Sequence, residues 1–73
     1  MLDINRALRR YRDDLGLTQK EMAECVGVHE NTIFNLEHYK FNITIKVLMA
    51  YAEFQGLTLS EFIKELEDFD AEE

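Results

Sequence analysis

The fold of this chain is decided by residues 17–37, which read LTQKEMAECVGVHENTIFNLE. Thr18 and Glu21 form a capping box, a pattern that predicts the start of a helix. Gly27 is expected to end that helix, because glycine adopts the positive φ that a tight turn between helices needs. A second helix is expected from about residue 29 to residue 38. The apolar residues expected to face inward are Met22, Ala23 and Val26 in the first helix, and Ile33 and Leu36 in the second. This stretch therefore predicts two short helices joined by a tight turn.

One further helix is expected before this pair, over about residues 3–15. Asp3 is a suitable N-cap, and Gly16 stands where a glycine commonly follows the last turn. The apolar residues of its stripe are Ile4, Leu8, Tyr11 and Leu15.

Two more helices are expected after the pair, and no strands. A loop at residues 39–43 leads to a helix that starts after Thr44 and stops before Gly56. The last helix starts at a second capping box, formed by Thr58 and Glu61. The apolar positions are Ile45, Leu48, Tyr51 and Ala52 in the first of these helices, and Leu59, Phe62, Ile63, Leu66 and Phe69 in the second. The chain is therefore predicted to be all-α.

The acidic charge of the chain is concentrated at its C-terminal end. The net charge is −7 over 73 residues. Residues 1–58 hold seven Lys and Arg against eight Asp and Glu, a balance of −1, whereas residues 59–73 hold one lysine and seven acids, a balance of −6. We therefore expect one small helical domain over residues 1–66 and an acidic C-terminal tail over residues 67–73.

Composition excludes several classes of protein. No apolar run approaches the ~20 residues that span a bilayer, and the N-terminus lacks the pattern of a signal peptide. Cys25 is the single cysteine, so no internal disulfide is possible. These features predict a cytoplasmic protein with no membrane association.

Residues 4–63 closely resemble the phage-repressor and Cro proteins, the XRE family of helix-turn-helix proteins. The residues that match the pattern of the family are Leu8, Arg12, Leu15, Gly16, Leu17, Thr18, Gln19, Met22, Ala23, Gly27, Val28, Ile33, Leu36, Glu37, Leu48, Ala52, Gly56, Leu57 and Leu59. The resemblance implies a compact five-helix domain of the lambda-repressor-like type, in which the second helix of the pair enters the major groove of DNA. It also implies that Arg12 and Glu37 form an ion pair that fixes the angle of this recognition helix.

The resemblance further implies which residues contact DNA. The base-reading candidates are Glu30, Asn31, Thr32 and Asn35, with Phe34 beside them and able to meet a thymine methyl group. The phosphate-contacting candidates are Thr18, Gln19, His38, Lys40 and Arg9. The alternative is that the asparagines are ordinary exposed polar residues, and that Arg6, Arg9 and Arg10 form a solvated helix face balanced by Asp13 and Asp14.

Three positions depart from the family pattern. The loop 39–43 lacks the glycine and the extra basic residues common after the recognition helix, Glu30 replaces a neutral or basic residue, and Gln55 replaces a buried leucine. With few cations, we expect modest affinity for each subunit, so that homodimers binding a palindromic operator matter more. The candidate dimer residues are Ile63, Leu66 and Phe69, which could instead fold back onto the core of the domain itself.

The function that this pattern favours is sequence-specific DNA binding by a transcriptional regulator, most simply a repressor. The rival is a protein-interaction module or antirepressor of the same fold that binds another regulator. No nucleophile–base set or phosphate loop suggests an enzyme or a cofactor. Cys25, His29 and His38 are the obvious metal-ligand types, but zinc sites usually need four well-spaced ligands, and Cys25 is expected to be a small buried side chain.

Overall fold

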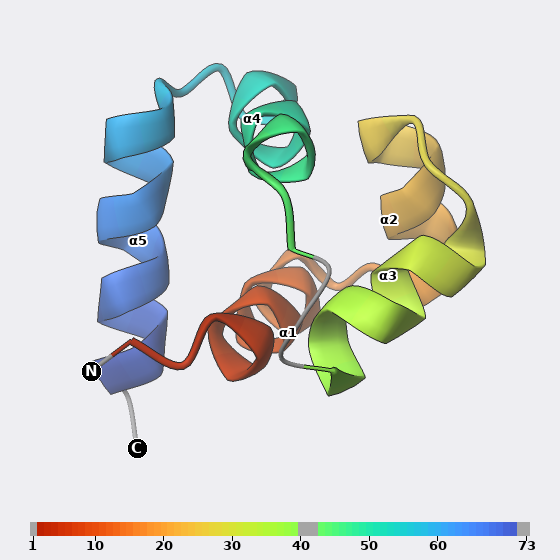
Figure 1. Cartoon of the computed structure of the whole chain (residues 1–73), viewed down its shortest axis with the longest axis horizontal. Helices are drawn as coiled ribbons and strands as arrows, with labels where there is room; N and C mark the ends of the chain where they lie inside the picture. The colour runs from red at the N-terminus through yellow and green to blue at the C-terminus, as the bar shows by residue number, and fades with distance from the viewer. Residues whose placement is uncertain (1, 40–42, 72–73) are drawn as a thin grey trace.

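The computed structural model describes residues 2–39 and 43–71, which form five α helices and no strand (Figure 1). The helices are α1 (Ile4–Leu15), α2 (Gln19–Val26), α3 (Glu30–His38), α4 (Ile45–Phe54) and α5 (Leu59–Ala71). The predicted all-α class and five-helix architecture are thus confirmed. The α2–α3 pair lies on one side of α1 and α5 on the other, with α4 packed against both α2 and α5 (Figure 1). No helix in the described part of the chain is long and apolar enough to cross a membrane.

The ends of the helices follow the capping signals in the sequence. The carboxylate of Asp3 accepts a hydrogen bond from the backbone amide of Arg6. Both capping boxes form: the hydroxyl of Thr18 accepts from the amide of Glu21, whose carboxylate accepts from the amide of Thr18, and Thr58 and Glu61 do the same at α5. Each box supplies acceptors to two amides that have no partner within the helix.

One hydrophobic core joins all five helices. An aromatic cluster occupies the contact between α1, α4 and α5, where the ring of Tyr11 meets that of Phe62 edge-on at 5.1 Å and the ring of Tyr51 stacks on Phe62 at 5.8 Å. The residues of the buried core are Ala7, Leu8, Tyr11, Met22, Ala23, Val26, Ile33, Leu36, Leu48, Tyr51, Ala52, Phe62 and Leu66.

Part of the expected acidic tail is helical. Residues 67–71 continue α5, and they pack against the first turns of α1. Nη2 of Arg6 lies 2.7 Å from Oδ1 of Asp70, and Nη1 of Arg10 donates to the backbone oxygen of Phe69 at 3.0 Å. The two arginines therefore meet the negative end of the α5 dipole, an arrangement that stabilises a helix end. The boundary expected after residue 66 thus lies within α5, and residues 72–73 of the expected tail lie outside the described residues.

The candidate dimer residues pack against the core to different degrees. Leu66 is 0% exposed, so it belongs to the core of its own subunit and offers no surface to a second copy. Phe69 is half-buried with its ring edge-on to that of Tyr11 at 5.8 Å, and Ile63 is half-buried against the same core. The apolar stripe of α5 therefore packs against the core of the same chain, and Phe69 contacts Tyr11 of α1.

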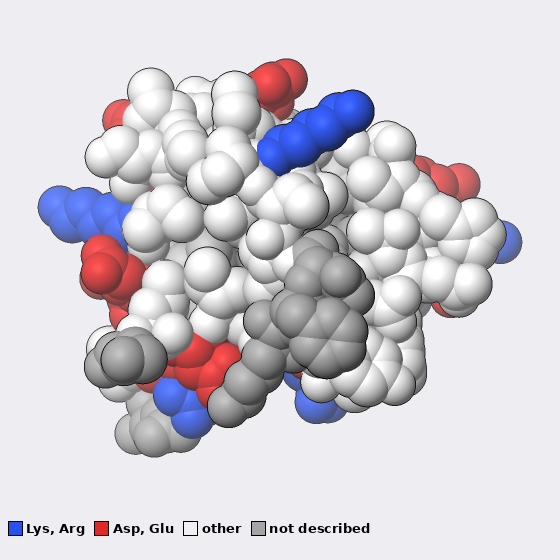
Figure 2. Space-filling model, in the orientation of Figure 1, with Lys and Arg blue, Asp and Glu red and all other residues white. Residues whose placement is uncertain are grey.

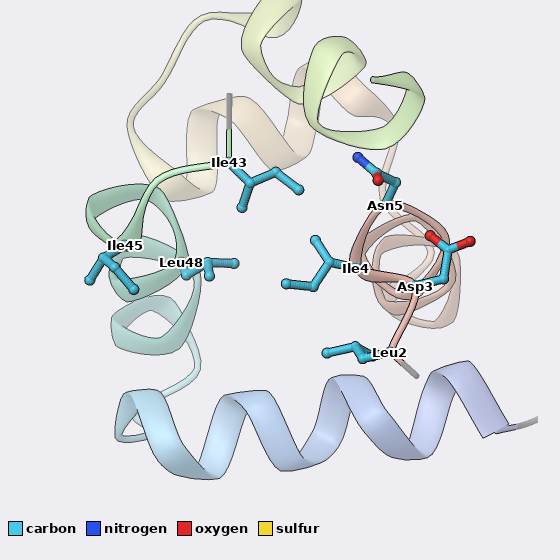
Figure 3. Close-up of a pocket in the computed structure, with 7 residues that line it drawn as sticks. All are labelled: Leu2, Asp3, Ile4, Asn5, Ile43, Ile45 and Leu48. Atoms are coloured by element: carbon cyan, nitrogen blue, oxygen red, sulfur yellow. The ribbon is translucent and has the colours of Figure 1, made fainter. Parts of the chain in front are cut away.

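Three apolar residues expected inside the fold are exposed. Ile45, 61% exposed, is the first residue of α4 and points away from the space between α1 and α4 (Figure 3). Leu15 is the last residue of α1, beyond the part that its neighbours cover. Cys25 is exposed because the ~100° advance per helical residue places it beside the stripe of Met22 and Val26, not on it.

Candidate nucleic-acid interface

The turn between α2 and α3 is tight and held by backbone hydrogen bonds. Gly27 adopts φ 77°, and its amide and that of Val28 both donate to the carbonyl of Ala23, at 2.9 and 3.0 Å. The imidazole of His29 then caps α3, because its Nδ1 accepts from the amide of Asn31 at 3.0 Å. The local sequence therefore produces the two-helix layout that it predicts.

One side of α3 faces outward. Successive residues advance ~100° around a helix, so positions 30, 31, 34, 35 and 38 share one arc. All five of these residues are exposed: Glu30, Asn31, Phe34, Asn35 and His38, which we call the outer face of α3. Thr32 lies off this arc and is half-buried. The structure thus brings Glu30, Asn31 and Asn35 of the base-reading candidates to one surface and leaves Thr32 beside it.

A buried ion pair holds the side of α3 next to the outer face against α1. Nε of Arg12 donates to Oε2 of Glu37 at 2.7 Å, and Nη2 donates to Oε1 at 3.0 Å. The side chain of Glu37 is 0% exposed and that of Arg12 only 12%. Hydrogen bonding to Glu37 raises the pKa of Arg12 above its already high value. Two parallel hydrogen bonds fix direction as well as distance, so this contact sets the angle of α3.

The two candidates at the start of α2 take part in this arrangement. Nε2 of Gln19 donates to Oε1 of Glu37 at 3.2 Å, so its side chain points at the ion pair. Thr18 is the N-cap of α2, with its hydroxyl engaged by the amide of Glu21. Gln19 thus links the start of α2 to Glu37, near the end of α3.

A hollow of about 270 Å³ lies between the start of α1 and the end of α3. It is lined by Asp3, Asn5, Arg6, Arg9, Glu37 and His38. Two of the predicted phosphate contacts, Arg9 and His38, thus meet at one place. Nδ1 of His38 donates to the backbone oxygen of Phe34 at 2.8 Å, and the two rings stack at 4.0 Å. The third candidate of this group, Lys40, lies outside the described residues.

Sequence reasoning missed one residue of this region. Nδ2 of Asn5, on α1, donates to the backbone oxygens of Leu36 and Tyr39, both at 2.6 Å. Asparagine in the first turn of a helix shows no periodicity and no spacing that would point to a contact 31 residues away. Only the missing glycine after α3 hinted that another group caps this helix.

Over α2 and α3, at the right of Figure 2, the visible face is mostly uncharged, and the charged side chains lie at its rim. Within residues 2–39 and 43–71, no three His, Cys, Asp or Glu side chains are close enough together to hold a metal ion.

Comparison with known proteins places the chain in a family. A family model described as helix-turn-helix matches residues 8–62, which include all of α2 and α3. A protein of Archaeoglobus fulgidus named as an uncharacterized HTH-type transcriptional regulator is 35% identical over 66 residues, 90% of this chain and 89% of that protein. A protein of Methanothermobacter thermautotrophicus with the same name is 49% identical over 35 residues, 48% of this chain, and the match spans only about half (51%) of its own length. The chain therefore belongs to the helix-turn-helix proteins of the phage-repressor and Cro (XRE) type.

Proposed function

We propose that this protein is a sequence-specific DNA-binding transcriptional regulator that reads the major groove with the outer face of α3. The observation that carries the proposal is the combination of exposed amides at Asn31 and Asn35 with a buried pair, Arg12 and Glu37, behind them. An asparagine held at a fixed angle can make two hydrogen bonds to N6 and N7 of adenine. The names of the archaeal relatives agree with this function.

The contacts to the DNA backbone are expected on both sides of α3. Arg9 and His38 would meet a phosphate at the hollow beside the end of the helix, joined by Lys40 from the following loop. Thr18 and Gln19 would approach a second phosphate at the start of α2, where the first-turn amides add a positive helix end. Because these groups supply few cations, the affinity of a single subunit should be modest and steeply salt-dependent.

We further propose that two copies bind a palindromic operator and act as a repressor. A two-fold dimer would place its recognition helices ~34 Å apart, one turn of DNA. Ile63 and Phe69 remain the candidates for the contact, since both keep part of their surface exposed. Binding over a promoter would block transcription there. The protein would act in the cytoplasm, where the DNA of cells such as those of the archaeal relatives lies.

Fluorescence anisotropy tests the proposal. Labelled DNA flanking the coding region is compared with scrambled DNA at about 50 and about 200 mM salt, and a selection from random DNA covers distant operators. We expect selective binding that survives the higher salt. Asn31→Ala and Asn35→Ala should each lower the affinity for the operator by about 1–3 kcal/mol, while Ser60→Ala, an exposed polar position on α5, should not. No selective DNA in either experiment would overturn the proposal.

A second function is favoured by a specific observation, the aromatic and acidic character of part of the outer face. Phe34 is 42% exposed, and Glu30 adds a carboxylate that nearby phosphates would repel. An exposed aromatic beside few cations suits a protein partner. If the DNA experiments fail, binding to another regulator through α3 becomes the better assignment, and Phe34→Ala should then abolish it.

A further inference from the structure

The end of α3 is built differently from the ends of α1 and α2. Those two helices stop at Gly16 and Gly27, glycines with φ near +75° whose amides bond back to the last turn. Tyr39 follows α3 in an extended conformation, with φ −120°. Its amide reaches the carbonyl of Asn35, and the sequence has no glycine directly after α3 to form the left-handed turn that ends the other two helices.

Asn5, on α1, supplies hydrogen-bond donors to the end of α3. Its side-chain amide donates to the carbonyl of Leu36, in the last turn of α3, and to that of Tyr39, just beyond the helix. In Figure 3 the side chain of Asn5 points from α1 toward α3. The orientation of the amide follows from its surroundings, because the reverse orientation would set an oxygen against two carbonyl oxygens. The side-chain amide of Asn5 thus donates to one carbonyl inside the last turn of α3 and to another just after it.

The contact of Asn5 adds a second point of attachment to the Arg12–Glu37 pair. Asn5 and Arg12 are seven residues apart on α1, two helical turns, and therefore share one stripe. The ion pair sets the angle of α3 at Glu37, and the contact of Asn5 holds the end of the helix around and beyond that residue against the start of α1. Arg9 lies between them, and it lines the same hollow as Asn5 and His38. The attachments therefore also set the position of the phosphate-contacting groups relative to the outer face.

We infer that Asn5 is a positioning residue for DNA recognition: it replaces the missing glycine after α3 and holds the recognition helix in register with the backbone contacts on α1. This inference rests on the proposed function. Its consequence is specific, because a recognition helix that pivots still meets phosphates but no longer presents Asn31 and Asn35 to the correct base edges. Loss of Asn5 should therefore reduce discrimination between DNA sequences more than it reduces binding to DNA in general.

The first experiment compares dissociation constants for the selected operator and for scrambled DNA. Asn5→Ala should weaken operator binding about tenfold and leave binding to scrambled DNA nearly unchanged. Asn5→Asp should be worse, since it sets carboxylate oxygens against the two carbonyls, and Asn5→Ser, which keeps one donor, should recover part of the selectivity. Thr58→Ala is the matched control, because it removes a helix cap at α5, far from α3, and lowers the melting temperature without touching the interface. Wild-type selectivity in Asn5→Ala, or an equal loss of selectivity in Thr58→Ala, would overturn the inference.

The second experiment tests the contact without DNA. In NMR spectra of the wild-type protein, the side-chain amide protons of Asn5 should exchange slowly with solvent and show couplings across hydrogen bonds to the carbonyls of Leu36 and Tyr39. Rapid exchange with no such couplings would overturn the positioning role, whatever the DNA experiments show. If the couplings are present but no DNA is bound selectively, the proposed function fails while the attachment of α3 by Asn5 stands.

Discussion

The guanidinium of Arg12, on α1, donates two hydrogen bonds to the carboxylate of Glu37, on α3, at 2.7 and 3.0 Å. A third bond from Nη1 of Arg12 to the backbone oxygen of Leu17, at 2.8 Å, ties the turn before α2 to the same group. One side chain of α1 therefore holds both helices of the motif. Both charges are withdrawn from water, so each depends on the other for its stability.

Removal of either member of this pair should strongly destabilise the fold. Glu37→Met and Arg12→Met each leave an unpaired buried charge, and each should lower the free energy of unfolding by about 3–5 kcal/mol. The double variant Arg12→Met with Glu37→Met should recover much of the loss, because no charge is then stranded. Urea denaturation measures all three, with Arg9→Met, an exposed arginine on the same helix, as the control. A double variant no more stable than the singles would contradict this reading.

Substitution of Gln19 should lower the stability of the fold through its contact with Glu37. Gln19→Glu sets a carboxylate against Oε1 of Glu37, which now accepts a hydrogen bond from that position, and it should cost about 1–3 kcal/mol of stability at neutral pH. The cost should shrink as acid protonates the new side chain. Gln55→Glu makes the same chemical change at an exposed position and should have a much smaller effect. Thermal unfolding of both variants at pH 7 and pH 4 checks the comparison; equal losses would show that Gln19 does not act through Glu37.

The contact between Arg6 and Asp70 should make the end of α5 sensitive to acid. The hydrogen bond from Arg6 holds the pKa of the Asp70 carboxyl below its ordinary value of 3.8. A carboxyl with a depressed pKa in the folded state stabilises the fold above its unfolded pKa, and this stability is lost as pH falls through the folded value. Asp70→Asn should therefore be less stable than the wild type at pH 6, and the difference should vanish in strong acid. Hydrogen exchange of the last turn of α5 measures this, and a difference that persists at low pH would argue against the ion pair.

Two buried tyrosines should resist alkali until the protein unfolds. Burial, with a smaller effect of Glu65, raises the pKa of Tyr11 to about 12, and burial raises that of Tyr51 further still. The folded state then keeps protons that the unfolded chain loses near pH 10, so stability falls as pH rises from about 10 towards 12. Absorbance of the phenolate and circular dichroism, followed together, should show these tyrosines ionising as the helices melt.

The hydroxyl of Tyr51 gives a related test in the core. Within the described part of the chain it has no hydrogen-bond partner, and neither has that of Tyr11. Tyr51→Phe removes a polar atom that burial disfavours, and it should leave stability at pH 7 unchanged or raise it slightly. The same variant should also lose less stability at alkaline pH than the wild type, because one of the two buried phenols is gone. A clear destabilisation at pH 7 would mean that the hydroxyl does have a partner.

The sequence predicts the elements of this fold more completely than it predicts the contacts between them. Capping boxes at Thr18 and Thr58 are local patterns of four residues, and they mark the starts of α2 and α5. The attachment of Asn5 to α3 joins groups more than 30 residues apart, so no local pattern signals it. The contacts of the last turns of α5 with Arg6 and Arg10 likewise join the two ends of the chain, and no local pattern signals them.

The pairing of the first helix with the last has a consequence for synthesis on the ribosome. Tyr11, on the buried side of α1, is covered in the finished fold by α5, whose Phe62 follows the recognition motif in the chain. The recognition motif is translated well before this cover exists, and α1 cannot be properly buried until it does. A nascent chain halted before residue 59 should therefore carry a helix-turn-helix that is complete in sequence but still open to proteases and chaperones. Once α5 has left the ribosome, it can cover α1 and complete the core that supports the motif.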